Sequence, residues 1–368
     1  MPAPLLLHAF STFAVGGPQV RFATIANHFG PSYRHAIVAM DGNLEARERL
    51  DPGLDVTYPA IHLPKSDTLG NARRIRAALK SIRPDTLFTM NWGTIEWAIA
   101  NRLQLVRHIH VEDGFGPEER NSQIPRRVLM RRLFLRGRTV VVPSLVLKGI
   151  AVNTWRLDPA RVRYLPNGID LARFDAVTPH IWPGIGPIIG TVAALRPEKN
   201  IARLIHAFAQ ARTHRVARLV IVGDGPERPA LERLATELGI AAEIIFAGHT
   251  PDPTALIAGF DIFAMSSDTE QMPISLLEAM AARLPVAATD VGDIRAILPP
   301  EQCPTITACE AAPLGTALAL LLDNPAQRAA LGLANHTKVA RDYALETMLT
   351  SWQELLTPPF ARLGERPG

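Results

Sequence analysis

Short apolar runs alternate with longer amphipathic stretches along the whole chain. The first half contains apolar runs of strand length at residues 5–10, 35–40, 85–90, 107–112 and 139–143. Between them lie stretches with helical periodicity, such as VRFATIANHF and TLGNARRIRAALKSI. Strands that are apolar on both faces and alternate with helices predict a parallel sheet that helices cover on both sides.

The pattern breaks at PNGIDLARFDAVTPHIWPGIGP, which is rich in proline and glycine, and it restarts at PIIGTVAA. We therefore predict an α/β protein made of two facing doubly wound, Rossmann-like domains with a cleft between them. The expected parts are a first domain at 1–168, a linker at 169–186, a second domain at 187–345, and a helical tail at 346–368 that packs back on the first domain. Ligands of such sheets bind at the carboxyl ends of the strands, so we expect the chemistry in the loops that follow strands.

Composition narrows the classes of function. A chain of 368 residues with 47% hydrophobic and 20% charged residues is long enough for two globular cores. A net charge of only +4 does not suit a nucleic-acid-binding protein. Cys303 and Cys309 have no further Cys or His at metal-ligand spacing, which disfavours a zinc site and a disulfide framework. No apolar run reaches the roughly 18–20 residues that span a bilayer, so we expect a cytoplasmic protein.

Two strand-to-helix loops could bind an anion. In STFAVGGPQVRF, Gly16 and Gly17 permit positive φ and close backbone approach, and Pro18 begins a helix with free N–H groups. A tight turn without a ligand is the alternative. In LRPEKN, Arg196 and Lys199 follow a strand, where a phosphate could bind. A solvated charged turn would have the same sequence.

The segment SSDTEQMPISLLE places Glu270 and Glu278 on either side of a predicted helix start. Pro273 fits the first helical position, and Met272 as N-cap has no side-chain oxygen for the exposed N–H groups. Those donors and the helix dipole suit a diphosphate. Glu278 lies in the second turn on an apolar stripe, where its carboxylate could accept hydrogen bonds from a diol. A buried glutamate satisfied by backbone donors is the alternative.

The segment RHIHVEDGFGPEE ends a strand with ionisable side chains. His108 and His110 point the same way, and either could be a satisfied core histidine, His108 more readily. Glu112 and Asp113 mark the end of the strand, where we expect side chains to face the cleft.

Two features of the first domain suggest an acceptor site. Asn91 and Trp92 follow the strand at 85–90, and Trp92 could either stack on a sugar ring or belong to the core. The segment IPRRVLMRRLFLRGR at 124–138 predicts a basic amphipathic helix with six arginines, which suggests docking to an anionic membrane surface. A solvated charged face packed on its sheet is the alternative.

Together these motifs resemble the retaining glycosyltransferases of family 4, whose fold is GT-B. The resemblance covers nearly the whole chain and is most specific at 248–292, where Glu270 and Glu278 form an E-x7-E signature before LLEAMA and PVAATDVG. The PNGID run at 166–170 is similar to the linker motif of the family, and the glycine pair at 16–17 to its N-terminal glycine loop.

The resemblance implies transfer of a sugar, with retention and without a metal or cofactor, from a nucleotide-diphosphate sugar to a hydroxyl of a glycan or lipid-linked acceptor. Such a hexosyltransferase would serve cell-surface polysaccharide or glycolipid biosynthesis, in the cytoplasm or peripherally at the inner face of the membrane. Glu278 would hold the ribose hydroxyls, Glu270 would face the sugar, and Lys199 would bind phosphate. Gly17 would approach the phosphate from the other domain. The backbone along sugar and phosphate would come from Gln271, Met272 and Pro273.

The chain departs from the family in two places. The family usually reads G-R-L-x-x-x-K, and here Ala194 replaces the arginine, whose role Arg196 could take from two positions further on. A histidine commonly follows the fourth strand of the first domain, and here Asp113 holds that place. Either His110 takes over this role, or Asp113 does so with Glu112.

Other functions are weaker alternatives. A nucleotide-sugar epimerase of GT-B architecture would turn over the donor without an acceptor, and a non-catalytic nucleotide-sugar-binding protein would explain the missing arginine. A dehydrogenase is disfavoured, because the nearest glycine run, GDGPER, lacks the third glycine of G-x-G-x-x-G. The sequence contains no D-x-D motif, so a metal-bridged diphosphate is not expected. It contains no Walker A motif either.

Overall fold

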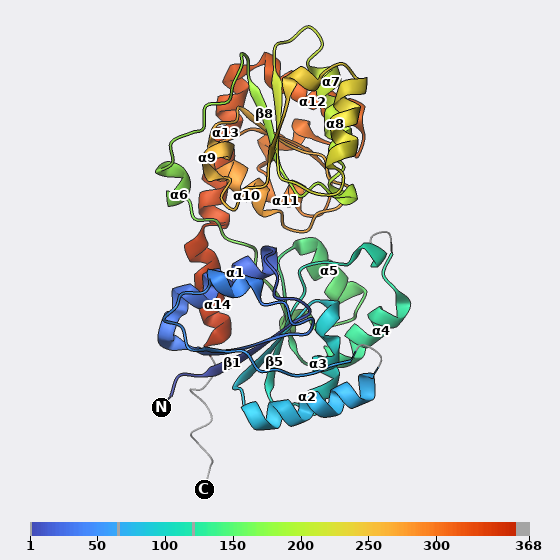
Figure 1. Cartoon of the computed structure of the whole chain (residues 1–368), viewed down its shortest axis with the longest axis vertical. Coiled ribbons are helices and arrows are strands. Elements are labelled where there is room, and N and C mark those ends of the chain that lie inside the picture. The colour runs from blue at the N-terminus through green and yellow to red at the C-terminus, as the bar shows by residue number, and fades with distance from the viewer. Residues whose placement is uncertain (1, 65–66, 120–121, 358–368) are drawn as a thin grey trace. The chain divides into compact units, whose positions relative to one another are not determined.

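The computed structural model describes residues 2–64, 67–119 and 122–357, and the chain divides into two compact α/β units (Figure 1). The first unit runs up to Pro166 and resumes at Leu349, and the second unit comprises Asn167–Met348. Residues 358–368 of the expected tail lie outside the described residues.

The segment expected to be a linker, 169–186, instead belongs to the second unit. Phe174 is buried there, the amide of His180 donates to the Ala255 carbonyl at 2.9 Å, and the Trp182 ring stacks on Phe260 with centroids 5.9 Å apart. Its scattered apolar side chains therefore anchor the segment to one unit, although it has no periodicity.

The first unit contains a parallel sheet of seven strands in the order β3-β2-β1-β4-β5-β6-β7. The strand order reverses between β1 and β4, so the topological switch point lies between these two strands. The strands are β1 (Leu5–Phe10), β2 (Arg34–Ala39), β3 (Val56–Thr57), β4 (Thr86–Met90), β5 (Arg107–Val111), β6 (Thr139–Val142) and β7 (Val162–Tyr164).

Helices cover this sheet, as the alternating pattern predicted. Asp67 caps one helix by accepting from the Gly70 amide at 2.8 Å, and Ser144 caps another by accepting from the Leu147 amide at 3.0 Å. The helices that begin in this unit are α1 (Gly17–Phe29), α2 (Thr68–Ile82), α3 (Ile95–Ala100), α4 (Pro125–Phe134) and α5 (Leu145–Asn153).

The second unit repeats the same topology with six parallel strands in the order β10-β9-β8-β11-β12-β13. Its switch point lies between β8 and β11. The strands are β8 (Ile188–Val192), β9 (Arg218–Val222), β10 (Ile244–Gly248), β11 (Ile262–Met265), β12 (Val286–Thr289) and β13 (Ile306–Thr307). The helices are α6 (Ala172–Asp175), α7 (Ile201–Ala211), α8 (Arg228–Glu237), α9 (Thr254–Ala258), α10 (Ile274–Ala281), α11 (Ile294–Ile297), α12 (Ala311–Asp323) and α13 (Pro325–Asp342).

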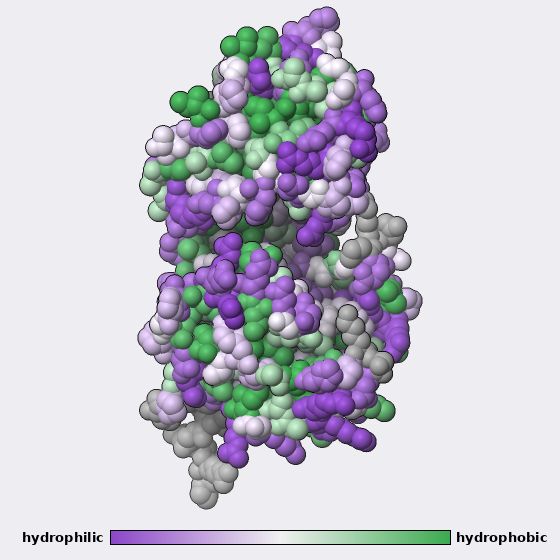
Figure 2. Space-filling model, in the orientation of Figure 1, coloured by the Kyte–Doolittle hydropathy of each residue, from purple (hydrophilic) through white to green (hydrophobic). Residues whose placement is uncertain are grey.

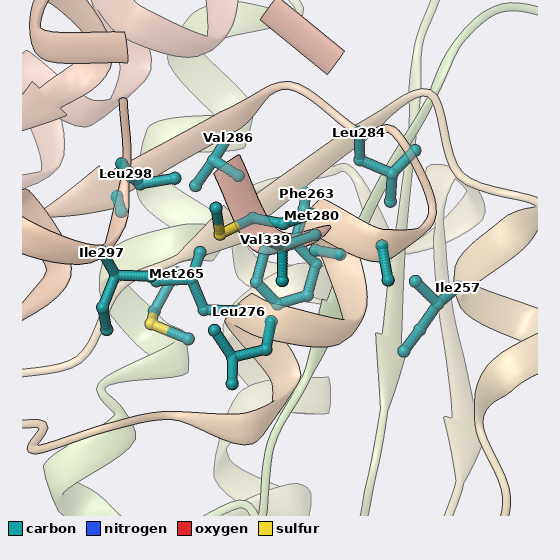
Figure 3. Packing of buried hydrophobic residues seen from close by; sticks show 14 of the residues in the cluster. Ile257, Phe263, Met265, Leu276, Met280, Leu284, Val286, Ile297, Leu298 and Val339 are labelled. Atoms are coloured by element: carbon teal, nitrogen blue, oxygen red, sulfur yellow. The ribbon is translucent and has the colours of Figure 1, made fainter. Parts of the chain in front are cut away.

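Helix α10 is embedded in the largest core of the second unit (Figure 3). Leu276 and Met280 are fully buried and belong to one cluster with Phe263 of β11, Val286 of β12 and Val339 of α13. Burial of each such side chain contributes about 1.5–3 kcal/mol. This packing fixes both the axis and the rotation of α10, and therefore the position of every side chain on it.

The last helix, α14 (Leu345–Leu356), begins in the second unit, and from Leu349 on it belongs to the first. Arg107 of β5 donates to the Leu355 carbonyl at 2.6 Å, near the end of α14. Trp352 is buried, with its ring centroid 6.5 Å from that of Phe88 on β4. The helix thus contributes a large aromatic side chain to the core of the first unit.

No helix within the described ranges is long and apolar enough to cross a membrane. On the face drawn in Figure 2, hydrophobic and hydrophilic residues are intermingled.

Removing the Trp352 indole tests how strongly α14 is attached. We expect Trp352→Ala to lower the free energy of unfolding by about 3–5 kcal/mol, because it leaves a cavity in a packed core. Urea unfolding followed by circular dichroism measures the change. Leu333→Ala on α13 is the control, since Leu333 is 62% exposed and its loss should change little. An unchanged unfolding midpoint in Trp352→Ala would contradict this packing role.

Candidate functional site

The loops that follow β8 and β11 meet at the switch point of the second unit. The first loop contains a short 3-10 turn, Pro197–Lys199, and the second carries Glu270. The Lys199 Nζ lies 2.5 Å from the Glu270 Oε1, and the Ser267 hydroxyl donates to the same oxygen at 2.7 Å. The second carboxylate oxygen of Glu270, Oε2, has no hydrogen-bond partner among the described residues, although the side chain is only 8% exposed. That oxygen is therefore available to a ligand.

Arg203 on α7, shortly after the first loop, binds the second loop. Its guanidinium donates to the Ser266 carbonyl and to the Asp268 carboxylate, each at 2.7 Å. The Asp268 amide also donates to the Glu198 carbonyl at 2.8 Å, and the Ser266 hydroxyl to the Lys199 carbonyl at 3.1 Å. We did not predict Arg203, because its partners are more than sixty residues away in the sequence.

The end of β12 and the loop after it contact the backbone of the loop that carries Glu270. Gly292 has φ of 56°, and a Cβ on it would lie 2.1 Å from the Glu270 carbonyl oxygen. The Thr289 hydroxyl donates to the Ser267 carbonyl at 2.6 Å. Only glycine permits both this backbone conformation and this approach. Gly292 lies in the quoted PVAATDVG run, but the sequence alone did not single it out.

The start of α10 differs by one residue from the prediction. The helix begins at Ile274, and Pro273 is its N-cap rather than its first residue, because Pro273 has an extended backbone with ψ of 120°. The expected absence of a side-chain cap is confirmed. Met272 is buried, and its carbonyl accepts from the Asn167 amide group at 3.1 Å. Asn167 of the PNGID run thus holds the residue before the helix start.

The Glu278 carboxyl has no hydrogen-bond donor among the described residues, although the main-chain carbonyl of Glu278 accepts from the Ala282 amide at 2.9 Å. The alternative of a glutamate whose side chain is satisfied by backbone donors is therefore not supported. Burial raises the pKa of Glu278 to about 7, the Arg173 charge partly lowers this pKa, and Asp252 raises it further. Arg173 itself donates to Asp252 at 2.8 Å and to the Thr254 hydroxyl at 2.9 Å. An ionisable, unpartnered carboxyl therefore lies in the second turn of an uncapped helix.

Arg196 is the most exposed of the predicted phosphate-binding residues. Its side chain is 64% exposed, and Glu198, at 4.0 Å, is its one ion-pair partner among the described residues. Ala194, which replaces the arginine of the family pattern, is exposed two residues earlier. The Arg196 side chain is thus not fixed by a strong ion pair.

In the first unit, Asp113 follows β5 next to the switch point. Arg21 of α1 pairs with both of its oxygens, at 2.6 and 2.9 Å, and the Asp113 amide donates to the Asn91 side-chain oxygen at 2.7 Å. Asn91 has φ of 55° and ψ of −177°, a strained conformation for a residue with a side chain. Two predicted site residues, Asn91 and Asp113, are therefore in direct contact.

His110 and Glu112, by contrast, lie inside the first unit, not at its surface. Both side chains are fully buried, and the His110 ring nitrogens contact the Thr89 hydroxyl at 2.8 Å and Glu112 at 3.3 Å. Glu112 also pairs with Arg131 of α4 at 3.1 Å. The expectation that side chains at this strand end face a cleft fails for them, because their face of the sheet is covered by α4. Of these three candidates, Asp113 alone keeps some exposure, with 12% of its side chain accessible, and its role stays a prediction.

His108 is a core histidine, as its place in the strand suggested. It is buried and shares the Thr89 hydroxyl with His110. Burial and the nearby His110 hold its pKa well below the ordinary value.

Of the two alternatives for Trp92, a sugar platform or a core residue, the structure shows a partly buried ring packed against a core cluster of the first unit. The ring also lies 5.1 Å from the Arg127 guanidinium and 5.3 Å from that of Arg131. The glycine pair differs from the expectation. Gly16 is the N-cap of α1 with an extended φ of −165°, and Gly17 is not in the positive-φ region either. A Cβ on Gly17 would meet nothing within 4 Å, so the space beside it is open.

The basic helix is shorter and less uniformly basic than predicted. The helix ends at Phe134. Three of the six expected arginines bind partners within the unit. Arg127 pairs with Glu118 and Glu119, Arg131 pairs with Glu112 and Glu119, and Arg138 donates to backbone carbonyls. The side chains that remain exposed are Arg126, Leu129, Arg132, Leu133 and Arg136. We refer to these five residues as the α4 patch.

No group of three or more His, Cys, Asp or Glu side chains in the described part of the chain is arranged to hold a metal ion.

Two family models together match most of the chain. Residues 15–173 match the model described as Glycosyltransferase Family 4, and residues 178–337 match the model described as Glycosyl transferases group 1. The chain belongs to glycosyltransferase family 4. Its two units form the GT-B fold of this family, as the sequence predicted.

Curated relatives are similar over part of this glycosyltransferase. It is 31% identical over 202 residues to the GDP-mannose-dependent monoacylated alpha-(1-6)-phosphatidylinositol monomannoside mannosyltransferase of Corynebacterium glutamicum, covering 50% of this chain and 53% of the relative. It is 34% identical over 245 residues to the putative glycosyltransferase EpsF of Bacillus subtilis, and this match covers 61% of this chain and 63% of EpsF. The matches thus span between half and two thirds of these two relatives.

Solved structures are similar over nearly the full length of the glycosyltransferase. HepE of Anabaena in complex with UDP superimposes with a TM-score of 0.80 and 16% identity, covering 96% of this chain and 99% of HepE. A glycosyltransferase of Rickettsia africae gives a TM-score of 0.78 and 16% identity, covering 96% and 98%. At this identity the likeness establishes the fold alone.

The raised pKa of Glu278 predicts a pH-dependent loss of stability in the ligand-free glycosyltransferase. Its folded pKa of about 7 exceeds the ordinary value of 4.5, so the folded state binds the proton more tightly, and stability falls as pH rises from 4.5 to 7. Above pH 7 the loss is about 3 kcal/mol. Glu278→Gln should therefore melt higher than the native chain at pH 8, and by a smaller margin at pH 5.

Thermal melts of both proteins at the two pH values measure this difference. Glu237→Gln on α8, whose side chain is exposed, is the control and should show no such trend. Equal melting of Glu278→Gln and the native chain at pH 8 would show that the Glu278 carboxyl is not buried as described.

Proposed function

We propose that this chain is a metal-independent, retaining hexosyltransferase that moves a sugar from a nucleotide-diphosphate sugar to a hydroxyl of a glycan or lipid-linked acceptor. The observation that carries the proposal is the grouping of Lys199, Glu270 and the uncapped start of α10 at one switch point, with Glu278 unpartnered in the second turn. The proposal extends to cell-surface polysaccharide or glycolipid biosynthesis as the setting.

The donor would be recognised by complementary charge and hydrogen bonding. The diphosphate would accept from the free N–H groups of α10 and bind the Lys199 ammonium. Arg196, whose side chain is exposed, would turn onto the phosphate and take the role of the arginine that Ala194 replaces. Glu278 would accept hydrogen bonds from the ribose hydroxyls, which supplies the partner that this carboxylate lacks in the free protein.

Glu270 would bind a hydroxyl of the sugar through its free Oε2. In the ligand-free chain, Lys199 neutralises Glu270, and an arriving diphosphate would compete for the same ammonium. The ion pair therefore keeps both side chains ordered before the donor binds, which lowers the entropy that binding must overcome.

The proposed reaction breaks the bond between the anomeric carbon and the phosphate oxygen and forms a bond from that carbon to the acceptor oxygen. Negative charge develops on the departing diphosphate, where Lys199, Arg196 and the α10 N-terminus would stabilise it. The acceptor hydroxyl would give its proton to the departing phosphate on the same face of the sugar. This front-face course retains the configuration without a nucleophile from the protein.

The similar proteins support a nucleotide-sugar donor but differ in the base. HepE of Anabaena has been solved with UDP and with UDP-glucose, while the mannosyltransferase of Corynebacterium glutamicum is GDP-mannose-dependent. A thermal-shift screen with UDP, GDP, ADP and their sugars identifies the donor. The chain should be stabilised by one nucleoside diphosphate and its sugar, and a uniform lack of response would count against the whole proposal.

Variants at the switch point test the assigned roles. We expect Lys199→Met and Glu270→Gln each to lower kcat by about a hundredfold or more, because each removes a charged group that contacts the reacting sugar phosphate. Glu278→Ala should abolish detectable transfer mainly by weakening donor binding. Glu237→Ala, on the exposed face of α8, is the matched control. Full activity in the Glu270 and Glu278 variants would refute the assignment, and donor turnover without any acceptor would indicate an epimerase.

We further propose that the α4 patch docks on an anionic membrane surface, next to a lipid-linked acceptor. Leu129 and Leu133 are 52% and 57% exposed and lie one turn apart, so they share a face of the helix. Arg126, Arg132 and Arg136 surround them and would bind lipid phosphates. The membrane-active surface is therefore proposed to be these five side chains, not the six arginines of the whole segment.

Vesicle co-sedimentation tests this docking. The native chain should bind vesicles that contain phosphatidylglycerol, and binding should weaken as salt rises. The double variant Leu129→Ser and Leu133→Ser should bind about tenfold or more weakly, because two exposed leucines no longer enter the bilayer. Leu333→Ser, at a similarly exposed leucine of the second unit, should bind like the native chain. Absence of salt-sensitive binding by the native chain would contradict the proposal.

A further inference from the structure

The Asp113 carboxylate is held by a two-pronged ion pair with Arg21. The two terminal nitrogens of the Arg21 guanidinium contact the two carboxylate oxygens at 2.6 and 2.9 Å. The side chains are 8% and 12% exposed. A planar guanidinium that meets a carboxylate in this way fixes its orientation as well as its charge.

The ion pair is itself supported from two sides. The Arg21 guanidinium carbon lies 6.0 Å from the ring centroid of Trp352, a buried residue of α14. On the other side, Asn91 accepts a hydrogen bond from the Asp113 amide at 2.7 Å, in a backbone conformation that is strained for asparagine. Strain of this kind persists only where surrounding contacts determine the structure, and it gathers at functional sites.

We propose that Arg21 is a positioning residue for sugar transfer, which aims the Asp113 carboxylate at a neutral hydroxyl of the acceptor. The ion pair uses one lone-pair site on each Asp113 oxygen, and a carboxylate has about four such sites. The sites that remain can accept hydrogen bonds. Because Arg21 compensates the charge, the site suits an uncharged alcohol rather than a cation. This inference rests on the proposed function and on the role given there to a sugar acceptor.

The Arg21–Asp113 ion pair differs from the buried ion pairs of Arg131 in the same unit. Arg131 also binds carboxylates, those of Glu112 and Glu119, but all three side chains are essentially without exposure. Asp113 keeps some exposure and lies beside the switch point, next to Asn91. The first cluster consolidates the packing of α4, whereas the Arg21 pair leaves carboxylate lone pairs near the surface.

The test measures transfer by the full chain with the donor identified in the nucleotide screen. We expect Arg21→Gln to lower kcat/KM for the acceptor by about tenfold or more, because the carboxylate loses its orientation, while the affinity for the nucleoside diphosphate is unchanged. Arg21→Lys should be intermediate, since an ammonium keeps the charge but not the two-pronged contact. In Arg21→Ala, added guanidinium chloride at low millimolar concentration should restore part of the activity. The double variant Arg21→Gln with Asp113→Asn should be no worse than Asp113→Asn alone.

Arg138→Gln is the matched control. Arg138 is 7% exposed and donates to the carbonyls of Asn101 and Arg102, not to Asp113 or Asn91. Its loss should lower stability without changing acceptor kcat/KM or responding to guanidinium. Arg21→Lys decides the question if Arg21→Gln does not fold.

The possible failures can be told apart. If the native chain transfers no sugar from any donor, the proposed function fails. If transfer occurs but Asp113→Asn is fully active, Asp113 has no role in it and Arg21 cannot act through Asp113. If Asp113→Asn is impaired while Arg21→Gln and Arg21→Lys are as active as the native chain, the positioning role of Arg21 is overturned. Additive effects in the double variant would overturn it as well.

Discussion

The candidate site of the second unit depends on the contact between the loops after β8 and β11, where Arg203 of α7 bridges to Ser266 and Asp268 of the second loop. This bridge brings Glu270 within reach of Lys199, although the two residues are far apart in the sequence. A loop that had to order itself around each incoming ligand would lose conformational entropy at every binding event. Here the fold has already ordered the loop, with Gly292 allowing the backbone behind it to approach closely. The candidate site is therefore preorganised by contacts outside the residues that would touch a ligand.

The packing that fixes α10 is unfavourable for the charged form of Glu278. The apolar residues that bury α10 fix the helix, and the same burial raises the pKa of its one carboxyl group to about 7. A helix of this core would be more stable with an apolar side chain at that position. The free protein thus retains a local conflict between packing and charge, and such conflicts concentrate where a ligand completes the structure.

The long apolar runs predicted five strands of the first sheet, whereas β3 and β7 were missed because two or three residues at a sheet edge show no period. Local motifs pointed to Lys199 and Glu270, which the structure brings into contact, and to Glu278, whose role stays a prediction. Arg21 and Arg203 could not be selected, because their partners lie 92 and 65 residues away and meet only through the strand order. His110 and Glu112 were misplaced for a related reason: alternation says which side chains share a face, but not that α4 covers that face.

The Glu278 carboxyl of the second unit and the Asp113 carboxylate of the first differ in whether a cation pairs with them, and this difference bears on what each can bind. In the second unit, Glu278 and one oxygen of Glu270 have no protein partner within the described residues, and an uncapped helix start lies between them. In the first unit, Asp113 is compensated by Arg21. An open set of donors beside acceptors suits a nucleoside diphosphate, which carries both charge and a diol, whereas a compensated carboxylate suits a neutral hydroxyl. Under the proposed function, the unpaired Glu278 carboxyl beside the start of α10 would therefore suit the donor, and the Asp113 carboxylate, paired with Arg21, would suit the acceptor.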